Sequence, residues 1–174
     1  MSEFAQPAAP IRRLFFRVDL AAQPQSLPLR RVLKHWQSQR GADVYPSQGT
    51  LDADALGPDR DHVFAFDRAE DDDFRLRFGG NVLEDLLGPL GTGELLSKPK
   101  ARRSAARLRR LFMLIELRGE PLVAGFEARL PDGEAVDVEI LVAPTSGDHT
   151  TIESLFGALA LTATPDASPM PDDD

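Results

Sequence analysis

The sequence predicts an α+β domain that has one antiparallel sheet of five strands and an additional amphipathic helix near its N-terminus. Two alternating apolar runs, 62–67 and 74–78, flank an acidic turn and are typical of paired strands. A long amphipathic segment at 100–117 follows them, and 122–162 then indicates three more strands with short turns. This order predicts helices grouped between the second and third strands and packed on one face of the sheet.

The first 26 residues read as an arm that is partly flexible. Within it, residues 11–20 (IRRLFFRVDL) are too apolar to remain in water uncovered, and we expect either a short strand or an arm laid on the body. The last segment, 164–174 (TPDASPMPDDD), has little to bury, and we expect a disordered acidic tail. The domain itself is therefore expected to span 27–163.

The first helix is predicted over 28–41. Pro28 is typical of a first helical turn, and Gly41 is typical of the residue that ends a helix. Its apolar residues follow the spacing of one helical face and are Leu29, Val32, Leu33 and Trp36. Two interpretations remain open, which are a helix packed on its own domain and a helix that also forms an interface with a second copy.

The acidic turn at 70–73 is interpreted as a solvated hairpin tip, because the spacing of a calcium loop is absent. A short helix is predicted over 81–87, with Asn81 as its N-cap. The glycines of 88–93 are interpreted as turn structure, since Lys98 lies at the wrong distance for a phosphate-binding loop.

The long helix at 100–117 has two chemically different sides. At about 100° per residue, one arc is apolar and contains Ala101, Ala105, Leu108, Leu111, Phe112 and Ile115. The opposite arc is basic and contains Arg102, Arg103, Arg107, Arg109 and Arg110. The basic arc indicates a solvated face or, alternatively, an anion site at Arg102, Arg103 and Arg107. Met113, Leu114 and Leu117 interrupt it, which predicts a cover from the N-terminal arm or a second subunit.

The final meander carries the strongest strand signals. Asp132 and Gly133 are typical of a tight hairpin turn, because such turns need positive φ. The strand after them alternates, with Val136, Val138, Ile140 and Val142 on one face.

Composition argues against most catalytic classes. The 174 residues include no cysteine, and the three histidines are scattered, so neither a thiol nucleophile nor a histidine-rich metal site is predicted. We therefore expect no enzyme and no metal. The net charge of −8 argues against broad nucleic-acid affinity. No apolar run approaches the roughly 20 residues of a membrane span, and no signal peptide is recognised, so we expect a cytoplasmic protein.

Several short segments, in this order and spacing, carry a family resemblance over about 27–163. They are Leu33-Lys-His-Trp36, Tyr45-Pro46-Ser47, Asp52-Ala-Asp-Ala-Leu56, Phe74-Arg-Leu-Arg-Phe-Gly79, Gly91-Thr-Gly-Glu-Leu95, Leu141-Val-Ala-Pro144 and Leu155-Phe-Gly-Ala-Leu159. On these segments the chain resembles the stand-alone bacterial proteins of the fifth PAS family, within the PAS superfamily of sensor domains. Ser47 and Gln48 depart from the arginine that this family often has after the loop proline.

The resemblance implies a cleft between the long helix and the sheet that receives a small ligand or a partner. Its expected lining residues are Phe78, Val82, Leu86, Leu108, Phe112, Phe126, Val138, Ile140 and Leu159. The alternative is that the same residues fill a closed core, because the two look identical in sequence. Members of the superfamily that form flavin or coumaric-acid adducts use a cysteine, and haem-binding members use a histidine on the long helix. Both cofactors are argued against, because the chain has no cysteine and residues 98–118 contain no histidine.

Three functions follow from these observations. The first is a sensory or signalling protein that acts through protein contacts, as a homodimer or with another partner. The second is a small-molecule carrier or nucleotide-binding regulator that uses Arg102, Arg103 and Arg107. The third and weakest is nucleic-acid binding through the same arginines.

Overall fold

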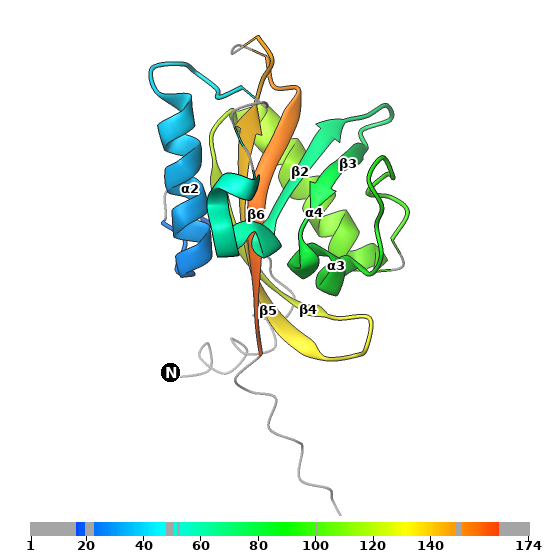
Figure 1. Ribbon diagram of the computed structural model, residues 1–174. Helices are drawn as coiled ribbons and strands as arrows, with labels where there is room; N and C mark the ends of the chain where they lie inside the picture. Colours follow the sequence, from blue (N-terminus) through cyan, green and yellow to red (C-terminus); the bar gives the residue numbers. More distant parts are fainter. Residues whose placement is uncertain are drawn as a thin grey trace, which may run out of the picture.

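The structure is a computed structural model that describes residues 23–47, 51, 53–99, 101–148 and 151–163, together with the backbone of 17–19. The helices are α2 (Leu27–Arg40), the 3-10 segment η2 (Ala53–His62, with a break at Gly57), α3 (Asn81–Leu87) and α4 (Arg102–Arg118). The strands are β1 (Arg17–Asp19), β2 (Val63–Arg68), β3 (Phe74–Gly79), β4 (Leu122–Arg129), β5 (Ala135–Thr145) and β6 (Ser154–Ala163). Figure 1 shows their arrangement.

All the strands form one antiparallel sheet in the order β1-β4-β5-β6-β2-β3. The predicted five-stranded sheet is confirmed, and β1 is added to it at the free edge of β4. Of the two interpretations of residues 11–20, the short strand is correct for Arg17–Asp19. The other residues of that segment, residues 1–10 and the predicted acidic tail lie outside the described residues.

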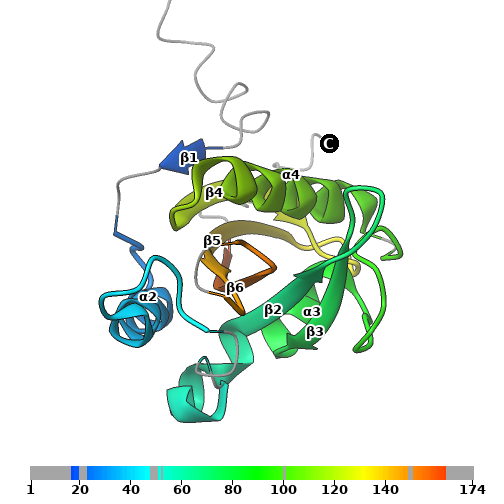
Figure 2. The ribbon, with the colours of Figure 1, turned by 90° about the horizontal axis from the view of Figure 1, so that it is seen from above.

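The two faces of the sheet are covered by different helices. Seen from above, α4 and α2 lie on opposite sides of the curved sheet (Figure 2). The alternation of β5 directs Val138 and Ile140 toward α3 and α4, and it directs Leu141 and Ala143 toward α2. The second half of β5 is therefore buried on both sides, which explains why its alternation gives way to a continuous apolar run.

Helix α2 is held on the sheet by its apolar stripe and by polar contacts at both of its ends. The indole N–H of Trp36 donates to the carbonyl oxygen of Pro144 at 2.9 Å. At the other end, the carboxylate of Glu139 accepts the backbone N–H groups of Gln25 and Ser26, each at 2.8 Å. Ser26 makes no side-chain cap bond, so a carboxylate from β5 neutralises the positive end of the helix instead.

The start of α3 differs from the prediction. Gly80, not Asn81, is the N-cap, and Asn81 is the first helical residue. A Cβ atom at Gly80 would lie 2.2 Å from the carbonyl oxygen of Asp61, so only glycine fits where the chain passes that backbone. Asn81 contacts the same neighbour through its amide, which donates to the Asp61 carboxylate at 3.4 Å.

Both hairpin turns form where their sequences indicate, although the loop at Asp132 and Gly133 joins Arg129 to Ala135 and is longer than a tight primed turn. Gly133 has φ of 93°, and the Asp132 carboxylate accepts the N–H of Glu134 at 2.9 Å. At the acidic turn, Asp71 and Asp72 are exposed and both have positive φ, 59° and 56°. Aspartate tolerates this conformation better than most residues do. The tip is thus solvated at Asp71 and Asp72, whereas Asp73 is buried and its carboxylate accepts the N–H of Phe74.

The pairing of β6 with β5 depends on the absence of a side chain at Gly157. A Cβ atom there would lie 2.1 Å from the Leu141 carbonyl oxygen and 2.7 Å from the Phe64 ring. We expect Gly157→Ala to lower the free energy of unfolding by about 3 kcal/mol, because backbone and ring must both move. Urea unfolding followed by circular dichroism measures this change.

Gly125→Ala is the matched control, since its nearest contact would be an ordinary 3.8 Å to the Val138 carbonyl oxygen. Equal urea midpoints for the two variants would contradict this account of the close contact at Gly157.

Candidate functional site

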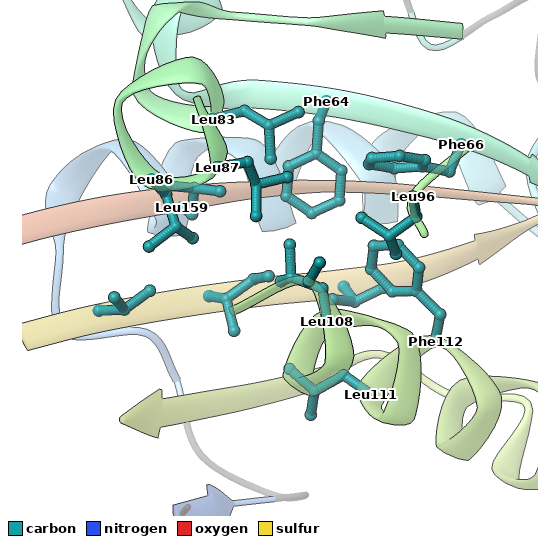
Figure 3. Packing of buried hydrophobic residues seen from close by; sticks show 14 of the residues in the cluster. Phe64, Phe66, Leu83, Leu86, Leu87, Leu96, Leu108, Leu111, Phe112 and Leu159 are labelled. Carbon is teal, nitrogen blue, oxygen red and sulfur yellow. The ribbon is translucent and has the colours of Figure 1, made fainter. Parts of the chain in front are cut away.

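The predicted cleft residues on the α4 side of the sheet come together in one apolar cluster. Val82 is partly buried at its margin, and the fully buried members are Leu86, Leu108, Phe112, Phe126, Val138, Ile140 and Leu159. Figure 3 shows Leu108 and Phe112 of α4 on the side of the helix that faces Phe64 and Phe66 of the sheet. The residues expected from the family resemblance are thus neighbours in space, and whether they receive a ligand stays a prediction.

Phe78 is the exception, because it lies on the other face and packs with the α2 cluster. The cause is a break in the pairing of β3 with β2, where Phe66 pairs with Leu76 but Ala65 pairs with Phe78. Arg77 is the extra residue of this bulge. An extra residue reverses the alternation that follows it, so Phe78 faces away from Phe74 and Leu76.

An aromatic cluster fills the centre of the α4 side. The ring of Phe112 lies 5.9 Å from that of Phe64, 5.1 Å from that of Phe66 and 5.1 Å from that of Phe74, measured between ring centroids. These distances are typical of rings in contact. All four side chains are at most 1% exposed. Phe112, one of the predicted lining residues, is therefore packed against three other rings in this conformation.

The four predicted interface residues of α2 are also buried. Leu29, Val32, Leu33 and Trp36 are between 0% and 7% exposed and pack against the sheet. In this conformation they are covered by their own domain, and a second copy could reach them only if α2 left the sheet.

The predicted anion-binding arginines have different environments. Arg102 and Arg103 are exposed in the first turn of α4. Arg107 donates to the carbonyl oxygen of Glu127, and its guanidinium lies 5.2 Å from the centroid of the Phe126 ring. Burial lowers the pKa of Arg107, and the nearby charge of Arg103 lowers it further. Arg107 is thus engaged with β4, while Arg102 and Arg103 are available to an anion.

A polar cluster that sequence reasoning missed attaches the tip of the β2–β3 hairpin to α4. Arg68 pairs with Glu116 at 2.9 Å and with Asp72 at 2.8 Å. Arg109 donates to the carbonyl oxygen of Asp72 at 2.7 Å. The signal in the sequence is the opposite charge of the acidic turn and the arginine-rich helix.

Toward its C-terminal end, the outer side of α4 carries large apolar side chains. Met113 is 37% exposed and Leu117 is 85% exposed. The described residues leave both uncovered, so this face combines exposed arginines with exposed apolar groups.

A family model described as PAS domain matches residues 25–160. The chain belongs to the PAS domain family. The resemblance seen in the sequence is thereby confirmed, and this PAS domain is a sensory or signalling module with a fold that is generally non-catalytic.

No curated protein matches this PAS domain. Among solved structures, an RNA-binding light-oxygen-voltage receptor is 16% identical, with a TM-score of 0.45 over 57% of this chain and 28% of its own. VqmA of Vibrio cholera, in a complex with ligand and DNA, is 10% identical, with a TM-score of 0.46 over 56% and 45%. A Rhodobacter sphaeroides LOV protein is 11% identical, with a TM-score of 0.43 over 60% and 61%. This PAS domain thus spans less than two thirds of each of them.

Two features are absent from the residues that the structure describes. No helix among them is long and apolar enough to cross a membrane. Within the same residues, no three His, Asp or Glu side chains are grouped so that they could hold a metal ion.

Truncating Phe112 tests whether its ring fills the interior of this PAS domain. We expect Phe112→Ala to lower the free energy of unfolding by about 3–5 kcal/mol and to leave an apolar cavity. Such cavities bind benzene, so the variant should show benzene-dependent NMR shifts that the wild type lacks. Val44→Ala, at an exposed position after α2, is the control and should change neither property. Equal benzene binding by the wild type would show that a cavity already exists.

Glu116 provides a pH test of the polar cluster. Burial raises the pKa of Glu116 above its usual range, the charge of Arg68 opposes this, and Asp72 adds to it. A carboxyl with a raised folded-state pKa binds protons more readily when folded, so its contribution to stability improves as pH falls and is lost above that pKa. We expect Glu116→Gln to melt slightly above the wild type at pH 7, with the difference shrinking toward pH 4. Thermal melts at the two pH values measure it, and a variant that is less stable at pH 7 would contradict the expectation.

Proposed function

We infer that this chain is a non-catalytic sensory or signalling PAS protein that acts through contacts with another protein chain. The observation that supports this most is the two-sided use of α4. Its inner side is packed into the core by Leu108 and Phe112, whereas its outer side leaves Met113 and Leu117 in water. Large apolar side chains one turn apart on an exposed helix face are typical of a surface that a partner covers.

A small ligand in the cleft is the alternative. The apolar cluster around Phe112 would be its contact surface, and an apolar pocket is the usual form of such sites. A ligand there must displace a ring that already contacts three other rings, so we rank protein contacts first.

Anion binding at α4 is the third function, as a nucleotide or nucleic-acid contact. It is supported by Arg102 and Arg103, which are exposed at the positive end of the helix dipole. The net charge of −8 and the engagement of Arg107 with Glu127 weigh against it. We also propose a location in the bacterial cytoplasm, which the absence of cysteine supports.

Native mass spectrometry of freshly purified protein distinguishes these functions, because it reports stoichiometry and bound small molecules together. We expect a complex of protein chains, either two copies or one copy with another protein, and no small-molecule adduct. Addition of nucleotides should leave the spectrum unchanged. A strict monomer that forms no complex with any protein would overturn the proposed function, and a retained small molecule would establish the alternative.

A further inference from the structure

The outer side of α4 carries a stripe with the spacing of a helix-pairing surface. Ala106, Arg110, Met113 and Leu117, which we call the α4 stripe, are separated by four, three and four residues. At about 100° per residue they lie within one narrow arc, opposite the buried residues Leu108 and Ile115. All four are exposed. This is the alternation by which two helices pack along a common seam.

We propose that the α4 stripe is the contact surface of a homodimer, in which α4 packs antiparallel against α4 of a second copy. This proposal rests on the proposed function and identifies the partner as a second copy of the same chain. In a two-fold antiparallel pair, the same surface must be complementary to itself. When the second stripe runs in the opposite direction, Leu117 lies opposite Ala106. Leu117 is the most exposed large apolar side chain of α4, and Ala106 is the smallest residue of the stripe. The same arrangement sets Met113 opposite the aliphatic stem of Arg110, which can cover it while its charge stays in water.

The charges at the two ends of α4 are complementary in the same arrangement. Arg102 and Arg103 are exposed in the first turn, and no acidic residue lies there to balance them. Exposed Glu120 follows the other end of the helix, just after the cap residue Gly119. An antiparallel partner places Glu120 and the negative end of its helix dipole beside these arginines. Arg118 lies about 100° around the helix from Leu117 and so faces away from the seam.

A parallel pair lacks this complementarity, because it would set the arginines of both first turns beside each other. The acidic segment 164–174 is the other charge-complementary occupant in this sequence. This segment follows β6, whose last residue, Ala163, pairs with Val136 of β5. Val136 in turn pairs with Ala128 of β4, and the neighbouring Glu127 accepts a hydrogen bond from Arg107 of α4. The only large apolar residue of the acidic segment is Met170 and it contains three prolines, so it suits the arginines and not Met113 and Leu117. A second α4 covers both parts of the stripe.

One short helix pair buries less surface than a standard stable interface, so the dimer should be weak and concentration-dependent. Sedimentation equilibrium of the full chain over a range of concentrations measures this. We expect the wild type to dimerise, and Leu117→Glu to raise the dissociation constant by about tenfold or more. Val44→Glu is the matched control, since Val44 is 61% exposed and lies outside α4, and it should dimerise like the wild type.

The natural absence of cysteine allows a direct test of orientation. Arg103→Cys and Glu120→Cys, each as the only cysteine, should not cross-link with themselves through a short bismaleimide. A mixture of the two variants should cross-link, because the antiparallel pair brings these positions together. Both sites are exposed, and circular dichroism checks that each variant is folded.

Any one of four results overturns the proposed α4–α4 contact, which we call the seam. They are a dimer unaffected by Leu117→Glu, self-cross-linking of Arg103→Cys, a mixture that does not cross-link, and a monomeric wild type. A wild type that is monomeric alone but bound to a different protein overturns the seam and leaves the proposed function standing. If replacing Asp172, Asp173 and Asp174 by asparagine lets a monomeric chain dimerise, the acidic segment is the occupant and the proposal is wrong.

Discussion

Helix α4 lies across the inner face of the sheet, and the burial of its apolar side is the interaction on which the rest of the domain depends. The cluster around it includes residues from β2, β3, β4, β5, β6 and α3. Phe112 contacts aromatic rings from both β2 and β3, and Arg109 and Glu116 of the same helix hold the hairpin tip. A shift of α4 would therefore disturb the interior, the hairpin and the outer stripe together, which is the coupling that a signalling module needs.

The sequence was sufficient for the fold because its local signals agreed with one another. The alternation of β5, the turn at Gly133 and the two arcs of α4 each select the structure that is found. The sequence was insufficient at positions where a single residue changes a strand pairing or the start of a helix. The bulge at Arg77 moves Phe78 to the opposite face, and no pattern in FRLRFG indicates a bulge. Position 80, the N-cap of α3, must be glycine because a Cβ atom there would clash with the carbonyl oxygen of Asp61. No local sequence pattern indicates this contact.

The candidate site was harder to predict than the fold, because the packing of the side chains decides whether apolar residues line a cleft or fill a core. The residues of the expected cleft could be named, yet only the ring distances show how closely Phe112 packs against Phe66 and Phe74. The basic face appeared uniform in sequence. In the structure Arg107 and Arg109 contact backbone carbonyls, whereas Arg102 and Arg103 remain exposed. Such differences arise from contacts with β4 and with the β2–β3 turn, whose residues Glu127 and Asp72 lie 20 and 37 positions from their arginine partners.

The choice between α2 and α4 as the partner surface depends on how many existing apolar contacts must be broken before a partner can bind. The stripe of α2 is already buried, and fully burying one large apolar side chain contributes roughly 1.5–3 kcal/mol. Detaching four such residues would cost at least about 6 kcal/mol before the bond from Trp36 to Pro144 is broken. A dimer through α2 must recover this from the new contact. The outer face of α4 requires no such loss, because the described residues already leave Met113 and Leu117 exposed. Free energy therefore favours association through α4 whenever both surfaces could make similar contacts.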